Sequence, residues 1–127
     1  MKNQILVFTD GAASGNPGTG GWGSIVCFGD RVRELGGGES HTTNNRMELL
    51  ALIRGLQAIR NEESINPIIV YSDSSYVLSG AEKNLVQWKN RNWLTTAGEP
   101  VKNQDLWQEL DQILSQLQNQ IIWTLVP

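Results

Sequence analysis

The chain has 127 residues, 39% of them hydrophobic, and a formal net charge of −3 at pH 7. This size and balance are typical of one soluble globular domain and exclude a disordered or fibrous chain. No apolar run approaches the roughly 18 residues of a membrane span, and the N-terminus has no signal-peptide pattern. We therefore expect a single cytoplasmic domain over residues 1–127 without a membrane partner. We also expect a monomer, an expectation that does not follow from the composition.

Strand and turn signals dominate the first third of the chain. The glycine-rich residues 11–21 are predicted to form a loop that begins after Asp10, and Gly29 with Asp30 predicts a tight hairpin turn. The strands predicted around them cover residues 4–9, 22–28 and 31–37.

Helices and strands alternate in the rest of the chain. Apolar residues at helical spacing predict a helix over residues 47–59, with Thr43 or Asn44 as its N-cap. The continuous apolar run IIVYS predicts a buried strand that ends at Asp73. The remaining predictions are helices over residues 74–80, 85–93 and 103–118 and a strand over residues 121–126. This order indicates an α/β fold, a mixed sheet with helices packed on it.

Three acidic residues are predicted to meet at one end of that sheet. Two hairpin connections make the first and third strands parallel, so the long helix starts at the end where Asp10 lies, with Glu48 in its first turn. A right-handed crossover through this helix then places the fourth strand parallel to the first, which brings Asp73 beside Asp10. Ligands commonly bind at this end of α/β sheets.

Such a cluster of carboxylates needs a cation. Neighbouring carboxylates repel each other, and an all-oxygen ligand set suits Mg²⁺ or Mn²⁺. Taken singly, Asp10 and Asp73 can be turn or cap residues, and Glu48 can simply favour a helix N-terminus electrostatically. Taken together, their convergence favours the metal site.

Four segments carry a family resemblance. FTDGAASGNPGTGGWG, TTNNRMEL, YSDSSYV and VKNQDLW, in this order and spacing, resemble the signature segments of bacterial type 1 ribonuclease H. The glycine-rich segment lacks the GK[ST] ending of a P-loop, which excludes a nucleotide-binding loop of that kind. The resemblance implies a ribonuclease H-like fold, with a five-stranded mixed sheet whose first three strands are antiparallel and whose fourth is parallel to the first.

The resemblance also implies an activity, an endonuclease that hydrolyses the RNA strand of RNA/DNA hybrids. Asp10, Glu48 and Asp73 would be catalytic metal ligands for two Mg²⁺ ions, with Mn²⁺ as a substitute. One ion would activate the attacking water and the other would stabilise the leaving 3′ oxygen, which leaves 3′-hydroxyl and 5′-phosphate ends.

Substrate contacts are implied for several polar residues. The amides of Asn16, Asn44 and Asn45 match positions that sense the two strands in the minor groove, and Thr43 matches a position that holds a DNA phosphate. The other substrate-binding residues expected here are His41, Ser75, Trp88, Lys89, Arg91 and Trp93. Loop and capping chemistry is the alternative for the asparagines, as is a solvated loop position for His41.

One segment of this acidic chain has a basic surplus. Residues 79–102 contain four basic and two acidic residues, interleaved with Trp88 and Trp93. This resembles the family's basic protrusion, in which lysines pair with phosphates, although tryptophans at this spacing are as often helix-packing residues. We expect modest hybrid affinity that falls with added salt.

The last residues depart from the family pattern. The chain stops at WTLVP, where the family continues into a loop with glycine and histidine and a helix bearing a fourth metal-binding Asp. We therefore expect a C-terminally truncated domain whose activity is weak or absent. A noncatalytic hybrid-binding fragment is the alternative function. A third reading, another nuclease or a transposase of the same broad fold, is disfavoured by TTNNRMEL.

Overall fold

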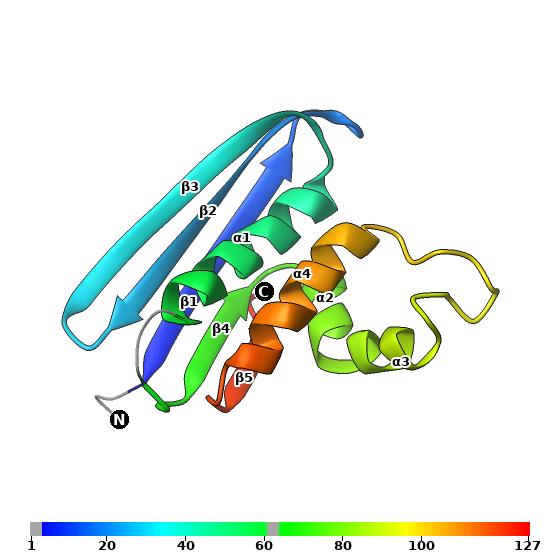
Figure 1. Ribbon diagram of the computed structural model, residues 1–127. Helices are drawn as coiled ribbons and strands as arrows, with labels where there is room; N and C mark the ends of the chain where they lie inside the picture. Colours follow the sequence, from blue (N-terminus) through cyan, green and yellow to red (C-terminus); the bar gives the residue numbers. More distant parts are fainter. Residues whose placement is uncertain (1–3, 61–63) are drawn as a thin grey trace.

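The computed structural model describes residues 4–60 and 64–127, which form one mixed sheet with helices packed against it (Figure 1). The elements in chain order are β1 (Ile5–Ala13), β2 (Gly18–Phe28), β3 (Arg31–Thr42), α1 (Asn44–Arg60), β4 (Ile68–Ser72), α2 (Ser75–Ser79), the π-helical turn η1 (Gly80–Asn84), α3 (Leu85–Asn90), α4 (Gln104–Gln116) and β5 (Ile121–Leu125). Within those described ranges, no helix is long and apolar enough to cross a membrane.

The sheet has the strand order β3-β2-β1-β4-β5. Strands β1, β2 and β3 are antiparallel neighbours, whereas β4 pairs in parallel with β1, and β5 in parallel with β4. This confirms the expected five-stranded mixed sheet. Figure 1 shows α1 and α4 side by side across one face of it, so the connection from β3 through α1 brings the chain back to β4 beside β1.

The glycine-rich segment is not the loop that was predicted. Strand β1 continues beyond Asp10 to Ala13, and β2 begins at Gly18, which leaves only residues 14–17 as a connection. The reason is close packing: a Cβ on Gly20 would lie 2.6 Å from Thr42 Cγ2 and 2.8 Å from the Ala12 carbonyl oxygen. Glycine here allows neighbouring strands to continue pairing, and β3 likewise extends to Thr42.

Two helix boundaries also differ from the prediction. Helix α1 begins at Asn44 and is capped by Thr43, whose Oγ1 accepts the backbone N–H of Arg46 at 3.2 Å. Glu48 is therefore the fifth residue of α1 and lies beyond its first turn. The helix expected over residues 85–93 ends at Asn90, because Asn92 and Trp93 adopt left-handed φ values of 55° and 65°.

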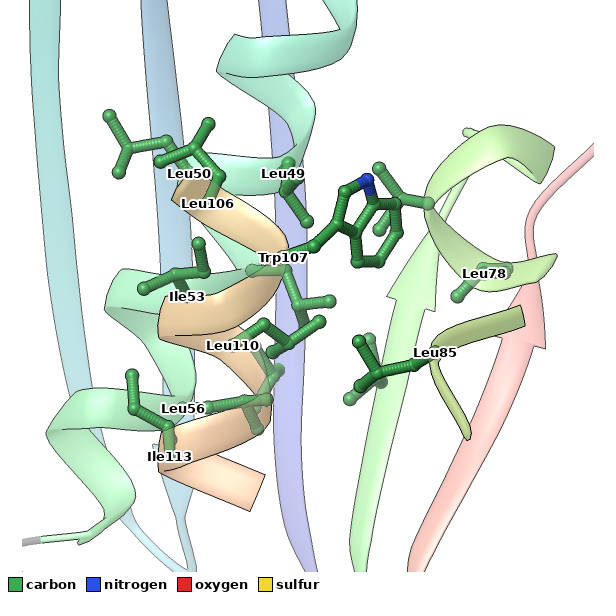
Figure 2. Packing of buried hydrophobic residues seen from close by; sticks show 14 of the residues in the cluster. Leu49, Leu50, Ile53, Leu56, Leu78, Leu85, Leu106, Trp107, Leu110 and Ile113 are labelled. Carbon is green, nitrogen blue, oxygen red and sulfur yellow. The ribbon is translucent and has the colours of Figure 1, made fainter. Parts of the chain in front are cut away.

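The core lies between the sheet and its helices and centres on Trp107. Figure 2 shows this indole projecting from α4 beside Leu49 of α1, toward the segments that carry Leu78 and Leu85. Trp107 has no exposed surface, and it contacts Tyr76 and Trp88 edge to face, with ring centroids at 5.6 and 5.1 Å. Aromatic pairs in this geometry add to the stabilisation from area burial alone.

Gly80 provides the test of this packing. Its hydrogen faces the buried Trp107 ring, so a Cβ would collide with several ring atoms. Overpacking of a core costs about 1–3 kcal/mol, whereas replacing glycine in a helix gains at most about 1 kcal/mol. We predict that Gly80→Ala lowers the free energy of unfolding by about 1–2 kcal/mol in urea denaturation.

The matched control is Gly21→Ala in β2. A Cβ there would contact the Gly37 carbonyl oxygen at the ordinary van der Waals distance of 3.5 Å. Its stability should change by less than about 0.5 kcal/mol, as is usual for surface substitutions. Equal stabilities of the two variants would contradict the packing described around Trp107.

Candidate metal centre and adjoining cavity

Three carboxylates from separate elements form one cluster. Asp10 lies in β1, Glu48 on α1 and Asp73 directly after β4, and each offers a carboxylate oxygen within 4.8 Å of the others. The carboxylates of Asp10 and Asp73 are on exposed residues, and Glu48 is half-buried. Their predicted convergence is therefore present in the structure.

Register and a close helix contact bring the acids together. Phe8 pairs with Tyr71 across the parallel β1 and β4, so Asp10 and Asp73 each lie two residues further along adjacent chain segments. Glu48 joins them because α1 crosses β1 at Gly11, where a Cβ would lie 2.6 Å from the Glu48 backbone nitrogen. A side chain at position 11 would push α1 away from the two aspartates.

The pKa of Glu48 is strongly raised by its place in this cluster. Burial, a hydrogen bond to Asp73 and repulsion from the charges of Asp73 and Asp10 raise the pKa of Glu48 to about 8, while a hydrogen bond from the Gly11 backbone opposes the rise. Within the described part of the chain, Glu48 Oε1 is buried and has no hydrogen-bond partner. An uncompensated buried oxygen of this kind is expensive unless a cation or a proton satisfies it.

The donor set fits a hard divalent cation. All three side chains supply oxygen, two of them are open to solvent for the water ligands that Mg²⁺ retains, and the orphaned Glu48 oxygen gains a partner. Asp10, Glu48 and Asp73 could thus hold Mg²⁺ or Mn²⁺.

The raised pKa of Glu48 predicts a pH-dependent stability. Because this carboxyl titrates at 4.5 ordinarily and near 8 when folded, the metal-free protein loses stability as the pH rises from 4.5 to 8. Glu48→Gln removes that loss. At pH 8 without metal we expect this variant to be about 1–2 kcal/mol more stable than the original chain, after allowance for solvent screening, and near pH 4.5 to match it.

Urea denaturation at the two pH values in EDTA measures the effect. Glu82→Gln, at an exposed position on η1, serves as the control and should follow the original chain at both pH values. Added Mg²⁺ should stabilise the original chain more than Glu48→Gln. A Glu48→Gln variant that is less stable than the original chain at pH 8 would contradict the electrostatic account.

A polar cavity adjoins the N-terminal ends of two helices. It has a volume of about 440 Å³ and is lined by Asn16, Thr43, Asn44, Asn45, Lys102 and Asn103. The structure therefore gathers the three asparagines and the threonine that the family resemblance singled out. Lys102 and Asn103 complete the lining, and sequence reasoning left them out of the site although VKNQDLW contains both.

The capping alternative also applies at this cavity. Thr43 caps α1, and Asn44 Oδ1 accepts the backbone N–H of Ala13 at 2.5 Å, which ties the start of α1 to the end of β1. The side-chain oxygen of Asn44 is thus already hydrogen-bonded within the fold, whereas its side-chain N–H groups can donate hydrogen bonds to a ligand. Capping and ligand contact are compatible here.

The other expected substrate residues lie outside this cavity. His41 is exposed near the end of β3, and Ser75 is the exposed first residue of α2. On α3, Lys89 pairs with Asp111 at 3.2 Å, and the partly buried Trp88 packs against Trp107.

The remaining two expected residues follow α3. Arg91 is exposed just after the helix, and Trp93 is partly buried against the core. Both tryptophans therefore take part in packing, which is the alternative to substrate contact for this segment. The basic side chains of this segment remain near the surface.

An acidic cluster lies where parallel strands end, and helix α1 connects it to a polar cavity at the N-terminal end of that helix. Ligand sites of α/β enzymes commonly have these features. The RNase H family model matches residues 2–127, and the chain belongs to the RNase H family of enzymes.

Proteins of known name agree with this assignment. A Ribonuclease H of Aromatoleum aromaticum is 50% identical over 125 residues, which are 97% of this chain and 78% of that protein. A Ribonuclease H of Neisseria gonorrhoeae is 48% identical over 126 residues, 99% of this chain and 83% of the relative.

Solved structures show the same fold. The N-terminal RNase H domain of a Mycobacterium tuberculosis protein has a TM-score of 0.74 and 25% identity. The match covers 98% of this chain and 87% of the solved chain. LC9-RNase H1, described as a type 1 RNase H, has a TM-score of 0.79 and 26% identity. The match covers 97% of this chain and 63% of the LC9-RNase H1 chain.

Proposed function

We propose that this protein is an endonuclease that hydrolyses the RNA strand of RNA/DNA hybrids. The observation that carries the proposal is the carboxylate cluster of Asp10, Glu48 and Asp73 together with the nearby amide-lined cavity, in a chain similar to proteins named Ribonuclease H. We also propose that it acts as a monomer in the cytoplasm, where its single cysteine, Cys27, would remain reduced.

The metal cluster would provide the chemistry. Bound there in a two-ion arrangement, Mg²⁺ would activate the attacking water and stabilise the leaving 3′ oxygen, so that cleavage leaves 3′-hydroxyl and 5′-phosphate ends. Asp10 and Asp73, both exposed, would face the scissile phosphate, and Glu48 would hold the cluster against α1. Mn²⁺ offers a similar preference for oxygen ligands.

The cavity would hold the nucleic-acid backbone. The N-terminal ends of α1 and α4 meet there, and helix N-termini attract anions through unpaired N–H groups and the helix dipole. Lys102 adds a positive charge, and the Thr43 hydroxyl would contact a DNA-strand phosphate. The amides of Asn16, Asn44 and Asn45 would sense 2′-hydroxyls in the minor groove.

A basic surface would extend this contact along the hybrid. Lys89 and Arg91 are exposed on and just after α3, and Trp88 and Trp93 hold that segment against the core. We assign His41 and Ser75 to the same substrate surface by their exposure near the ends of β3 and β4, as well as by the resemblance. Since the whole chain is acidic, binding would depend on this local placement of positive charge.

The proposal is tested with an RNA/DNA hybrid labelled on the RNA strand, in Mg²⁺, in Mn²⁺ and in EDTA. We expect weak cleavage of hybrid and none of duplex DNA, no cleavage in EDTA, and a loss of at least about 100-fold for Asp10→Asn, because one proposed metal ligand loses its charge. Ser79→Ala, an exposed position on α2 outside the proposed site, serves as the control.

Three outcomes would contradict the proposal. Cleavage in EDTA would exclude the metal cluster as the catalyst, and preference for duplex DNA would favour another nuclease of the same fold. Hybrid binding that survives Asp10→Asn, without turnover by the original chain at any metal concentration, would support a noncatalytic hybrid-binding domain.

Lys102 tests the cavity separately from the metal cluster. Removing one phosphate contact should weaken hybrid binding several-fold and reduce the slope of log affinity against log salt by about 1. We predict this for Lys102→Ala in a fluorescence anisotropy titration. Arg60→Ala, which removes the same charge from the last residue of α1, is the control and should retain affinity and slope. Equal effects of the two variants would show that only net charge matters.

A further inference from the structure

Asn103 occupies an unusual position at the cavity wall. It precedes α4 with left-handed backbone angles, φ 60° and ψ 30°, and its side chain makes no capping hydrogen bond to that helix. The side chain is instead held by two other residues. Its Nδ2 donates to the Tyr76 hydroxyl at 2.9 Å, and its Oδ1 accepts from Arg46 Nη1 at 3.3 Å.

These partners fix which way the amide faces. A guanidinium can only donate, so Arg46 must face the carbonyl oxygen of Asn103. The Tyr76 hydroxyl oxygen accepts from the Asn103 amide and also from Trp107 Nε1, at 3.1 Å, and an indole N–H can only donate. Among the residues that the structure describes, the second amide N–H of Asn103 has no hydrogen-bond acceptor, and Asn103 lines the cavity.

Each partner is itself held in place. Arg46 makes two hydrogen bonds to the Asp105 carboxylate, at 3.0 and 2.7 Å, so its positive charge is paired with Asp105. The Tyr76 ring packs edge to face on Trp107, a residue without exposed surface. Tyr76 also lies on the first turn of α2, three residues after Asp73, so one short segment connects the acidic cluster to the cavity wall.

We propose that Tyr76 is a positioning residue for substrate binding. Its hydroxyl fixes the Asn103 amide so that the remaining N–H donates to a backbone phosphate oxygen of the hybrid in the cavity. The inference rests on the proposed function for the identity of the substrate. It assigns Tyr76 no contact with the nucleic acid or with the reacting atoms.

Tyr76→Phe removes the hydroxyl and keeps the ring that packs on Trp107. Because one hydrogen bond in this range corresponds to about a 3- to 10-fold change in an equilibrium constant, we expect KM for hybrid to rise by that factor while kcat stays within about 2-fold. Asn103→Ala should give an equal or larger rise in KM. If Tyr76 acts through Asn103, the double variant should match Asn103→Ala alone.

A merely structural role predicts a different result. Tyr76→Phe would then lower the melting temperature without changing KM well below that temperature, and such a result would overturn the inference. Rises in KM that multiply in the double variant would overturn it as well, since independent effects add as free energies. Dissociation constants for hybrid in EDTA, measured in parallel, keep this test separate from catalysis: absence of turnover by the original chain counts against the proposed function, not against the role of Tyr76.

The Asn103 side chain can also be observed directly by NMR. In the original chain, its side-chain NH₂ resonances should shift when a short hybrid is added without metal, and Tyr76→Phe should reduce that shift. An Asn103 resonance that does not respond to hybrid in the original chain would overturn the inference even if Tyr76→Phe does not fold.

Discussion

The close contact between β1 and α1 at Gly11 is the constraint on which the functional end of this molecule depends. Only a residue without a side chain lets the helix approach so closely that Glu48 joins two aspartates from neighbouring parallel segments. The contact is maintained by the buried apolar face of α1, while carboxylate repulsion opposes it. Packing is therefore what holds like charges together, and the raised pKa of Glu48 reflects their repulsion and burial in the absence of a cation.

Helix α1 also links the acidic cluster to the cavity. Asn44 and Glu48 are four residues apart and so lie on the same face of the helix, which places a proposed substrate contact and a candidate metal ligand on one side. The N-terminal end of α4 reaches the same region through Arg46, which binds both Asn103 and Asp105. One candidate metal ligand, Glu48, and several of the proposed substrate contacts are thus supported by the helix pair α1 and α4, while Asp10 and Asp73 are positioned by the sheet.

Topological reasoning from the sequence predicted the sheet, the main helix and the meeting of three acids, because hairpins and right-handed crossovers leave few alternatives. It was wrong for the glycine-rich strands, since glycines such as Gly20 carry no side-chain periodicity and their role depends on packing against Thr42. It also extended α3 too far, because the left-handed Trp93 has no sequence signal. Asn103 was missed for a related reason: its orientation depends on Tyr76, a residue distant in sequence.

The central claim is that three mutually repelling carboxylates form a divalent metal site in which Glu48 carries a proton until the metal binds. Calorimetric titration with Mg²⁺ in two buffers of different ionisation enthalpy, at pH 7 and at pH 9, measures the protons exchanged on binding. With the pKa of Glu48 at about 8, binding should release most of one proton at pH 7 and little at pH 9. Mg²⁺ binding at pH 7 without proton release, or undiminished binding by Asp10→Asn, would contradict the account.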